Sequence, residues 1–181
     1  MRFLISAAGT GGHVFPALEF SAECIKNNHE VIWMGTKTGL ESSKVPEKNI
    51  QFLTIPMRGF RGKGLLNKCI SIFGLIASTG KSIIFLFQNN INFVVCFGGY
   101  ISLPVGIAAI LCRNQIILHE QNAVMGTSNK LLAPFAKIIF LGTPLAMAFK
   151  KNTQLVGNPI KRINKHQDMV PPKSDELKIY V

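Results

Sequence analysis

The sequence predicts an α/β protein with a Rossmann-like parallel sheet and helices on both faces. Short apolar segments without polar alternation recur along the chain, and most are followed by a stretch that can form a helix. Strands of this kind are buried on both sides, as they are in parallel sheets covered by helices. The 181 residues are enough for one such domain and a fragment of a second.

The elements follow one another in a regular order. Residues 3–5 form an apolar strand, and a glycine-rich turn leads into a helix in which Leu18, Ala22 and Ile25 keep helical spacing. The remaining elements are expected as strands at residues 31–34 and 51–55, a helical region at 65–87, a strand at 93–96, a glycine-rich turn at 97–104, a helix at 105–112, a strand at 116–118, a short helix near 127–133 and a strand at 137–141.

Polar residues near the carboxyl end indicate a domain boundary. We expect the first domain to span residues 1–163. Residues 164–176 are polar, contain two adjacent prolines and are typical of an interdomain linker. Residues 177–181 are apolar again and are interpreted as the first strand of a truncated second domain, because one strand alone cannot form a sheet.

The charge is strongly positive and unevenly distributed. The net charge is +11, and between Glu47 and Asp168 the only acid is Glu120, against fourteen lysines and arginines from Lys48 to Lys165. Such a surface attracts phosphate, nucleic acid or anionic lipid. Because no nucleic-acid-binding motif is recognisable, we do not expect nucleic acid as a partner.

The cysteines indicate neither a metal site nor a secreted protein. They form no CxxC pair and have no metal-ligand spacing, so no metal is expected. The apolar start at residues 3–5 is too short for a signal peptide, which favours the cytoplasm. Residues 82–112 carry no charged residue, but polar residues, glycines and Pro104 interrupt them, so no transmembrane span is expected.

The apolar region at residues 65–87 has two interpretations. An apolar stripe at helical spacing usually packs in a core. Here, however, it carries many large apolar residues, and basic side chains surround it, namely Arg58, Arg61, Lys63, Lys68 and Lys81. A pattern of this kind suits shallow seating on an anionic bilayer.

The first candidate site is the loop Gly9-Thr10-Gly11-Gly12-His13 between the first strand and helix. Doubly wound sheets bind ligands beyond the carboxyl ends of their strands. Glycines permit close backbone approach, and the helix start offers free N–H groups to a phosphate or sugar oxygen. His13 is a candidate general base. Val14 replaces the third glycine of the dinucleotide fingerprint, and no acid follows the second strand, so a nicotinamide oxidoreductase is disfavoured.

The second candidate site is the turn that follows the strand at residues 93–96. Gly98 and Gly99 suggest a backbone shaped to contact an anion, and Tyr100 can stack or hydrogen-bond. Ser102 can cap the following helix.

The third candidate site follows the strand at residues 116–118, where His119, Glu120, Gln121 and Asn122 stand in a row. Four polar side chains at the end of a buried strand are difficult to place in a core. Glu120, the isolated acid, either pairs with a base or takes part in chemistry.

Four segments together resemble glycosyltransferase family 28 enzymes, which transfer N-acetylglucosamine from UDP-N-acetylglucosamine to lipid I in bacterial peptidoglycan synthesis. The segments are Gly9-Thr10-Gly11-Gly12-His13-Val14-Phe15-Pro16-Ala17-Leu18, Phe97-Gly98-Gly99-Tyr100-Ile101-Ser102, His119-Glu120-Gln121-Asn122-Ala123-Val124 and Val156-Gly157-Asn158-Pro159. The resemblance implies the amino-terminal half of a two-domain GT-B enzyme that needs no metal or other cofactor. It also implies a peripheral position on the cytoplasmic face of the inner membrane, with UDP-GlcNAc, lipid I and the anionic membrane surface as partners.

The resemblance also implies roles for individual residues. His13 and Glu120 would be catalytic, with His13 as the base for the acceptor 4-hydroxyl. The donor would contact Thr10, Gly11, Gly12, Asn122 and Lys161, a lysine where the family usually has arginine. The acceptor would contact Gly98, Gly99, Tyr100, Ser102, Glu120 and Gln121. The alternative is a non-catalytic half-domain that only binds lipid or membrane.

Overall fold

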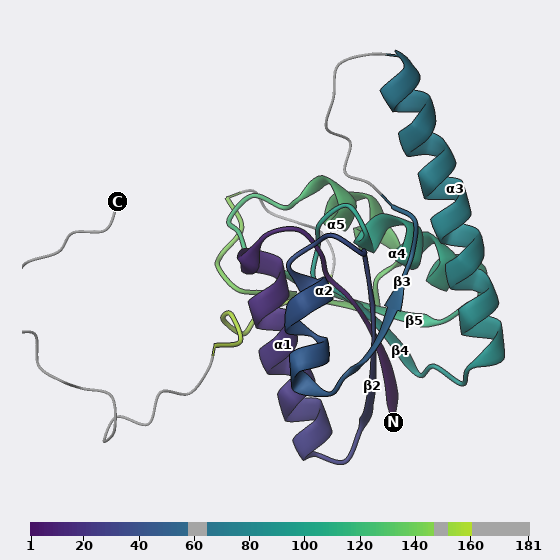
Figure 1. Ribbon diagram of the computed structural model, residues 1–181. Coiled ribbons are helices and arrows are strands. Elements are labelled where there is room, and N and C mark those ends of the chain that lie inside the picture. Colours follow the sequence, from purple (N-terminus) through teal and green to yellow (C-terminus); the bar gives the residue numbers. More distant parts are fainter. Residues whose placement is uncertain (58–64, 147–151, 161–181) are drawn as a thin grey trace, which may run out of the picture.

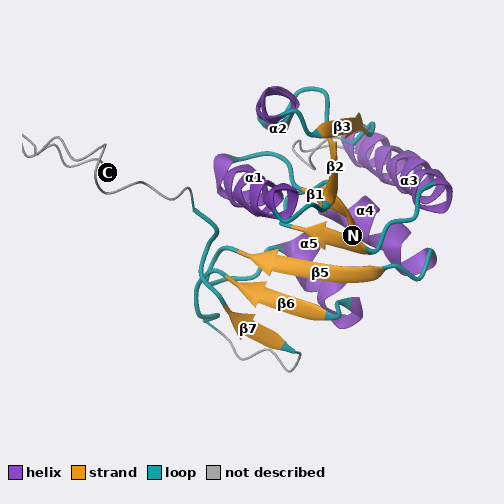
Figure 2. Cartoon of the chain, turned by 90° about the horizontal axis from the view of Figure 1, so that it is seen from below, coloured by secondary structure: helices purple, strands orange, loops and turns teal. Residues whose placement is uncertain are grey.

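The protein is built around one parallel sheet of seven strands. A computed structural model describes residues 1–57, 65–146 and 152–160, with side chains in the second range described from residue 70 onward. The strands lie in the order β3-β2-β1-β4-β5-β6-β7 and all pairs are parallel, which confirms the predicted fold class (Figures 1 and 2). They are β1 (Arg2–Ser6), β2 (Glu30–Gly35), β3 (Gln51–Thr54), β4 (Phe93–Cys96), β5 (Gln115–Glu120), β6 (Ile138–Leu141) and β7 (Thr153–Leu155).

Helices cover both faces of this sheet. The helices are α1 (Gly11–Lys26), α2 (Glu41–Lys44), α3 (Leu65–Gln88), α4 (Ser102–Leu111) and α5 (Thr127–Leu132), with 3-10 turns at Pro46–Lys48 and Ala133–Phe135. Successive strand side chains point to opposite faces. Ile5 and Trp33 therefore pack with α1, whereas Leu4 and Ile32 pack in the core beneath α3, α4 and α5 (Figure 2).

Two element boundaries differ by more than one residue from the sequence-based expectation, and helix α2 and strand β7 were not predicted. Helix α4 begins at Ser102 rather than at residue 105, because Pro104 occupies the first turn, where a missing N–H costs nothing. Strand β5 continues through His119 and Glu120, which were expected in a loop. Strand β7 was not predicted, since its Thr-Gln-Leu sequence lies at the sheet edge and carries no apolar pattern.

The expected linker at residues 164–176 and the expected strand at residues 177–181 lie outside the described residues. The same holds for Lys161 and for the basic residues Arg58, Arg61 and Lys63. The domain boundary therefore stays a prediction.

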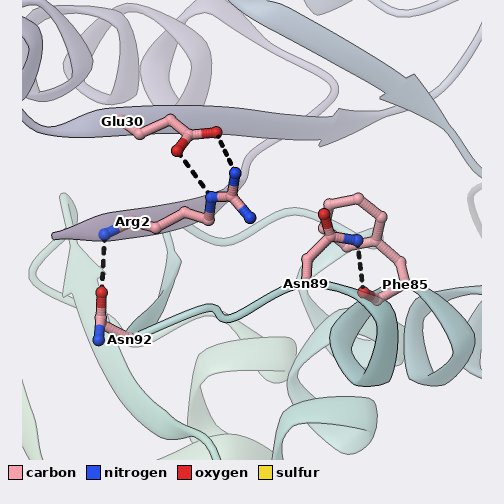
Figure 3. A network of polar contacts seen from close by, with 5 residues as sticks. All are labelled: Arg2, Glu30, Phe85, Asn89 and Asn92. Atoms are coloured by element: carbon pink, nitrogen blue, oxygen red, sulfur yellow. Dashed lines mark hydrogen bonds and ion pairs between the residues drawn. The ribbon is translucent and has the colours of Figure 1, made fainter.

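Polar contacts connect the amino ends of the strands, at the end of the sheet opposite the glycine loops. The guanidinium of Arg2 pairs with the carboxylate of Glu30 at 2.7 Å and joins β1 to β2 (Figure 3). The backbone N–H of Arg2 donates to the Asn92 side-chain oxygen at 2.8 Å, just before β4. The Asn89 amide donates to the carbonyl of Phe85 at 2.9 Å at the end of α3. These contacts align the strands whose other ends carry the candidate site.

Helix α3 has one packed side and one exposed side, and its amino end projects beyond the sheet (Figure 1). Leu75, Ile83 and Phe85 pack against the core, as an apolar stripe usually does. A second set of large apolar side chains is exposed, namely Ile70, Ile72, Phe73, Ile76, Ile84 and Phe87, the two phenylalanines at 75% each. The segment Ile70–Gln88 is long and apolar enough to cross a membrane, and 17% of it is buried. Core packing and an exposed apolar surface thus coexist on one helix.

Candidate functional site

The candidate site lies where the strand order changes direction. Strands β1 and β4 are neighbours, but the chain leaves β1 toward β2 and leaves β4 toward β5 on the other side. The two connections diverge at this point and leave a crevice beyond the carboxyl ends of the strands. The predicted loop at residues 9–13 and the part of the predicted turn at 97–104 that precedes α4 flank this crevice, and the residues after β5 lie next to them.

The first loop turns sharply into helix α1. Gly9 has a φ of +101°, a conformation that side chains disfavour. Thr10 precedes the helix without capping it by its side chain. Gly11 and Gly12 occupy the first turn, where no intrahelical carbonyl is available to their N–H groups. His13 follows them directly, so the imidazole sits beside free amides that can bind an anion.

A buried acid that sequence reasoning missed supports this loop. Glu41 at the start of α2 is fully buried, and its carboxylate accepts hydrogen bonds from the Gly9 N–H at 3.3 Å, the Thr36 N–H at 3.0 Å and the Thr36 hydroxyl at 2.7 Å. It therefore ties the turn after β1 to the turn after β2. No sequence signal marked Glu41, which stands among exposed polar residues. The Gly9 N–H therefore already has a hydrogen-bond partner in the Glu41 carboxylate.

The second loop approaches the first through two glycines with positive φ, Gly98 at +93° and Gly99 at +78°. A Cβ atom on Gly98 would lie 3.1 Å from the His13 ring, and one on Gly99 would overlap with the carbonyl oxygen of Ala8. Only glycine lets the two loops come this close.

Ser102 lies beneath this loop instead of facing the crevice. The residue is fully buried, and its hydroxyl donates to the carbonyl of Gly98 or Ser6 and accepts from the Gly98 N–H. It makes no side-chain cap on α4. The expectation of a helix cap was wrong, because the hydroxyl holds the glycine turn from below.

Glu120 is surrounded by amide donors. One carboxylate oxygen accepts from the backbone and side-chain N–H groups of Asn122, both at 3.1 Å, and the other accepts from the Gly126 N–H at 2.9 Å and the Asn129 amide at 3.0 Å. Its side chain is buried, and among the residues that the structure describes it forms no ion pair. The Glu120 carboxylate thus holds the loop between β5 and α5 in place of an ion pair, and because Glu120 also lines a hollow beside His13, its direct role in chemistry stays a prediction.

Gln121 is also turned inward. It is 7% exposed, and its side-chain oxygen lies 3.0 Å from Nδ1 of His13. The imidazole is thereby held at its Nδ1 atom. Gln121 thus contacts the candidate base, and its contact with the acceptor stays a prediction.

Two hollows meet at His13 and the Gly99 turn, and a third lies beside them. One of about 440 Å³ is lined by His13, Gly98, Gly99, Tyr100, Leu103, Glu120, Asn122 and the start of α5. A second of about 490 Å³ lies across His13 and Tyr100 and reaches Thr10 and Gly39. A third of about 590 Å³ contains Gly12, Phe15, Asn122 and Asn158. The structure thus gathers most of the predicted site residues around one histidine. Lys161 lies outside the described residues.

No metal centre is found in the described ranges, where no group of three or more His, Cys, Asp or Glu side chains could hold an ion. Cys24, Cys96 and Cys112 are free thiols. The groups that line the two hollows at His13 include its imidazole, the Glu120 carboxylate and the neutral side chains of Tyr100 and Asn122.

Comparison with known proteins agrees with this geometry. Residues 3–141 match the model of the glycosyltransferase family 28 N-terminal domain. The chain is 42% identical over 169 residues to the UDP-N-acetylglucosamine–N-acetylmuramyl-(pentapeptide) pyrophosphoryl-undecaprenol N-acetylglucosamine transferase of Psychrobacter cryohalolentis, covering 88% of this chain and 45% of that protein. It is 40% identical over 162 residues to the equally named protein of Idiomarina loihiensis, covering 89% and 45%.

Solved structures show the same likeness. The crystal structure of Acinetobacter baumannii MurG superposes with a TM-score of 0.73 at 33% identity, covering 84% of this chain and 44% of that one. The kitacinnamycin glycosyltransferase shares the fold alone, with a TM-score of 0.69 at 10% identity. The chain thus spans a little under half the length of the curated relatives it matches, at 45% for the first two. Because the family match covers residues 3–141, the chain belongs to glycosyltransferase family 28 and carries its amino-terminal domain.

Proposed function

We propose that this chain is the acceptor-side half of an enzyme that transfers N-acetylglucosamine from UDP-N-acetylglucosamine to lipid I, giving lipid II. The observation that carries the proposal is the position of His13, on the first turn of α1 between two hollows and facing two glycine turns. A transferase needs a base, an anion-binding surface and room for a sugar at one place. The names of relatives that are 40% and 42% identical supply the substrate class.

The proposed reaction is a single displacement. His13 removes the proton from the 4-hydroxyl of the muramyl sugar as that oxygen attacks the anomeric carbon of N-acetylglucosamine. The bond from that carbon to UDP breaks on the opposite face, and its electron pair leaves with UDP. The configuration at the anomeric carbon inverts, and no metal takes part in this scheme.

Fewer backbone N–H groups are available to bind an anion than the number of glycines in the two loops suggests. The N–H groups of Gly9 and Gly98 already bind Glu41 and Ser102. The amides left for the acceptor diphosphate are those of Gly11 and Gly12 and of the turn at Gly99. These amides gain strength from the positive end of α1.

The substrate contacts divide between the hollows. Gly99 and Tyr100 line the two hollows assigned to the acceptor, and Asn122 lines the third, which also contains Gly12 and is assigned to the donor sugar. Thr10 lines one of the acceptor hollows and Gly11 follows it, and both are retained, with Lys161, as donor contacts. Ser102, Glu120 and Gln121 act by holding loops and the base in place.

The exposed side of α3 is proposed to rest on the cytoplasmic face of the inner membrane. Six large apolar side chains on that helix are exposed to solvent. Such residues near lysines and arginines bind an anionic bilayer without crossing it. Seating of this kind would bring the lipid-linked acceptor to the glycine loops.

The test is release of UDP by a protein in which this chain is followed by a carboxy-terminal half, its own or that of the Acinetobacter baumannii relative. Binding of UDP first shows that the added half is folded. We expect UDP release that requires both UDP-N-acetylglucosamine and lipid I. If vesicles carrying lipid I are bound but no UDP is released, the chain is a non-catalytic lipid-binding half-domain instead.

A further inference from the structure

A continuous chain of hydrogen bonds runs from the backbone to His13. The carbonyl oxygen of Gly157 lies 3.2 Å from Nε2 of His119. Nδ1 of His119 lies 3.1 Å from the side-chain nitrogen of Gln121. The side-chain oxygen of Gln121 lies 3.0 Å from Nδ1 of His13. Four residues, from β5, the residue after it, α1 and the segment after β7, are thus linked in series.

The Gly157 carbonyl, at the start of this series, decides which atom donates and which accepts in every hydrogen bond that follows. A carbonyl oxygen can only accept, so Nε2 of His119 carries a proton. In a neutral imidazole, Nδ1 of His119 is then an acceptor, and the group facing it is the NH₂ of Gln121. The same NH₂ also lies 3.4 Å from the carbonyl of His119, a second acceptor. The oxygen of Gln121 therefore faces His13, and Nδ1 of His13 must donate.

The surroundings keep His119 neutral and in place. It is 4% exposed, and burial lowers its pKa, against a smaller opposing effect of the Gly157 carbonyl and the Glu120 charge. Its ring stacks on Phe97 with centroids 5.1 Å apart. The Gly157 segment is itself anchored, because the N–H groups of Val156 and Gly157 both donate to the carbonyl of Leu141.

We propose that His119 and Gln121 are positioning residues that fix His13 in one tautomer, with the proton on Nδ1 and the lone pair of Nε2 free. Resting on the proposed function, this tautomer is the one in which His13 can act as a base toward the crevice. Gln121 then does with a neutral amide what a carboxylate does in other base-orienting pairs. A histidine free in water favours the opposite tautomer, with the proton on Nε2, so the proposal makes a definite claim.

Nitrogen-15 NMR of the histidine rings in this 181-residue chain tests the proposal without substrate. In the unchanged chain we expect the neutral His13 ring to show a protonated Nδ1 and an unprotonated Nε2. Gln121→Leu removes the acceptor, so the His13 proton should move mainly to Nε2. Gln115→Leu makes the same change at the amino end of β5, where the Gln115 side chain accepts a hydrogen bond from Lys137, and should leave His13 unchanged.

A conservative variant separates positioning from simple packing. Gln121→Glu still offers an acceptor to Nδ1 of His13, so the His13 tautomer should be retained. The same variant removes the donor facing His119, so Nδ1 of His119 should become protonated. These outcomes need no sugar transfer, so failure of the proposed function would leave them standing. A proton on Nε2 of His13 in the unchanged chain, or an unaltered His13 ring in Gln121→Leu, would overturn the proposal.

Discussion

The α-carbon of Gly99 lies so close to the carbonyl oxygen of Ala8 that no side chain fits between them. This contact joins the turn after β4 to the turn after β1 across the crevice. The positive φ of +78° at Gly99 adds a second reason for glycine. The approach of the two loops, and with it the shape of both acceptor hollows, depends on this residue.

Gly99→Ala should therefore destabilise the protein and widen the crevice. A non-glycine residue in the left-handed region costs about 1–2 kcal/mol, and the overlap with Ala8 adds to it. The free energy of unfolding in urea measures the effect. Gly80→Ala is the matched control, because its Cβ meets nothing within 4 Å inside helix α3. We expect no loss of stability there, and equal losses in the two variants would contradict the role of Gly99.

Glu41→Gln should loosen the first glycine loop. The substitution turns one acceptor oxygen of a buried carboxylate into a donor that faces the N–H groups of Gly9 and Thr36. An unsatisfied buried polar group costs about 1–3 kcal/mol, and the Gly9 amide should exchange its hydrogen faster. Glu47→Gln, which removes only an exposed pair with Lys44, should change stability by less than about 0.5 kcal/mol. Slow exchange of the Gly9 amide in Glu41→Gln would argue against the loop-holding role.

Phe73→Ser and Phe87→Ser should weaken binding to membranes. Both rings are 75% exposed, so their loss removes apolar surface that is available to a bilayer without altering the core. Sedimentation with vesicles containing phosphatidylglycerol should show at least a several-fold loss of binding. Phe135→Ser, also exposed but far along the chain from α3, is the control. Vesicle binding that survives both α3 changes would place the membrane contact elsewhere.

Stability should fall at high pH because of Cys96. Burial raises the pKa of this thiol from 9.0 to about 12, against a smaller opposing effect of a hydrogen bond with Ser102. Below pH 9 the thiol is protonated in both states, and above it only the unfolded thiol ionises. The stability contribution is thus present at pH 8 and is lost as the pH rises toward 12. At pH 10 the loss is about 1.4 kcal/mol. Cys96→Ala should make the decrease between pH 8 and 10 shallower, and an unchanged slope would refute this cause.

Much of the fold could be predicted because apolar strands and glycine turns leave local signals. The glycine loops could be placed at one edge, since parallel strands end together. The contacts that the polar residues at and after the end of β5 make could not be predicted. Whether Glu120 meets a cation or four amides depends on Asn129 and Gly126, which the fold brings back to it. Glu41 was missed for the same reason, because its partners come from two other turns.

The roles of Gln121 and Ser102 also depend on how deeply their side chains are buried. The residue pattern at the end of a strand does not reveal this. Both were expected at the surface of the acceptor pocket. The sheet places them beneath it, where they contact His13 and the glycine turn. Sequence reasoning located the right loops, whereas the contacts of these two side chains depend on the packing beneath the loops.

The most direct measurement of the central claim is the turnover number for UDP release after substitution of His13, in the protein that carries a carboxy-terminal half. His13→Ala should lower kcat by at least about 100-fold, the usual contribution of a general base, with little change in KM for UDP-N-acetylglucosamine. His29→Ala, a histidine near the amino edge of the sheet, should leave kcat unchanged. A His13→Ala protein that releases UDP at the unaltered rate would contradict the account.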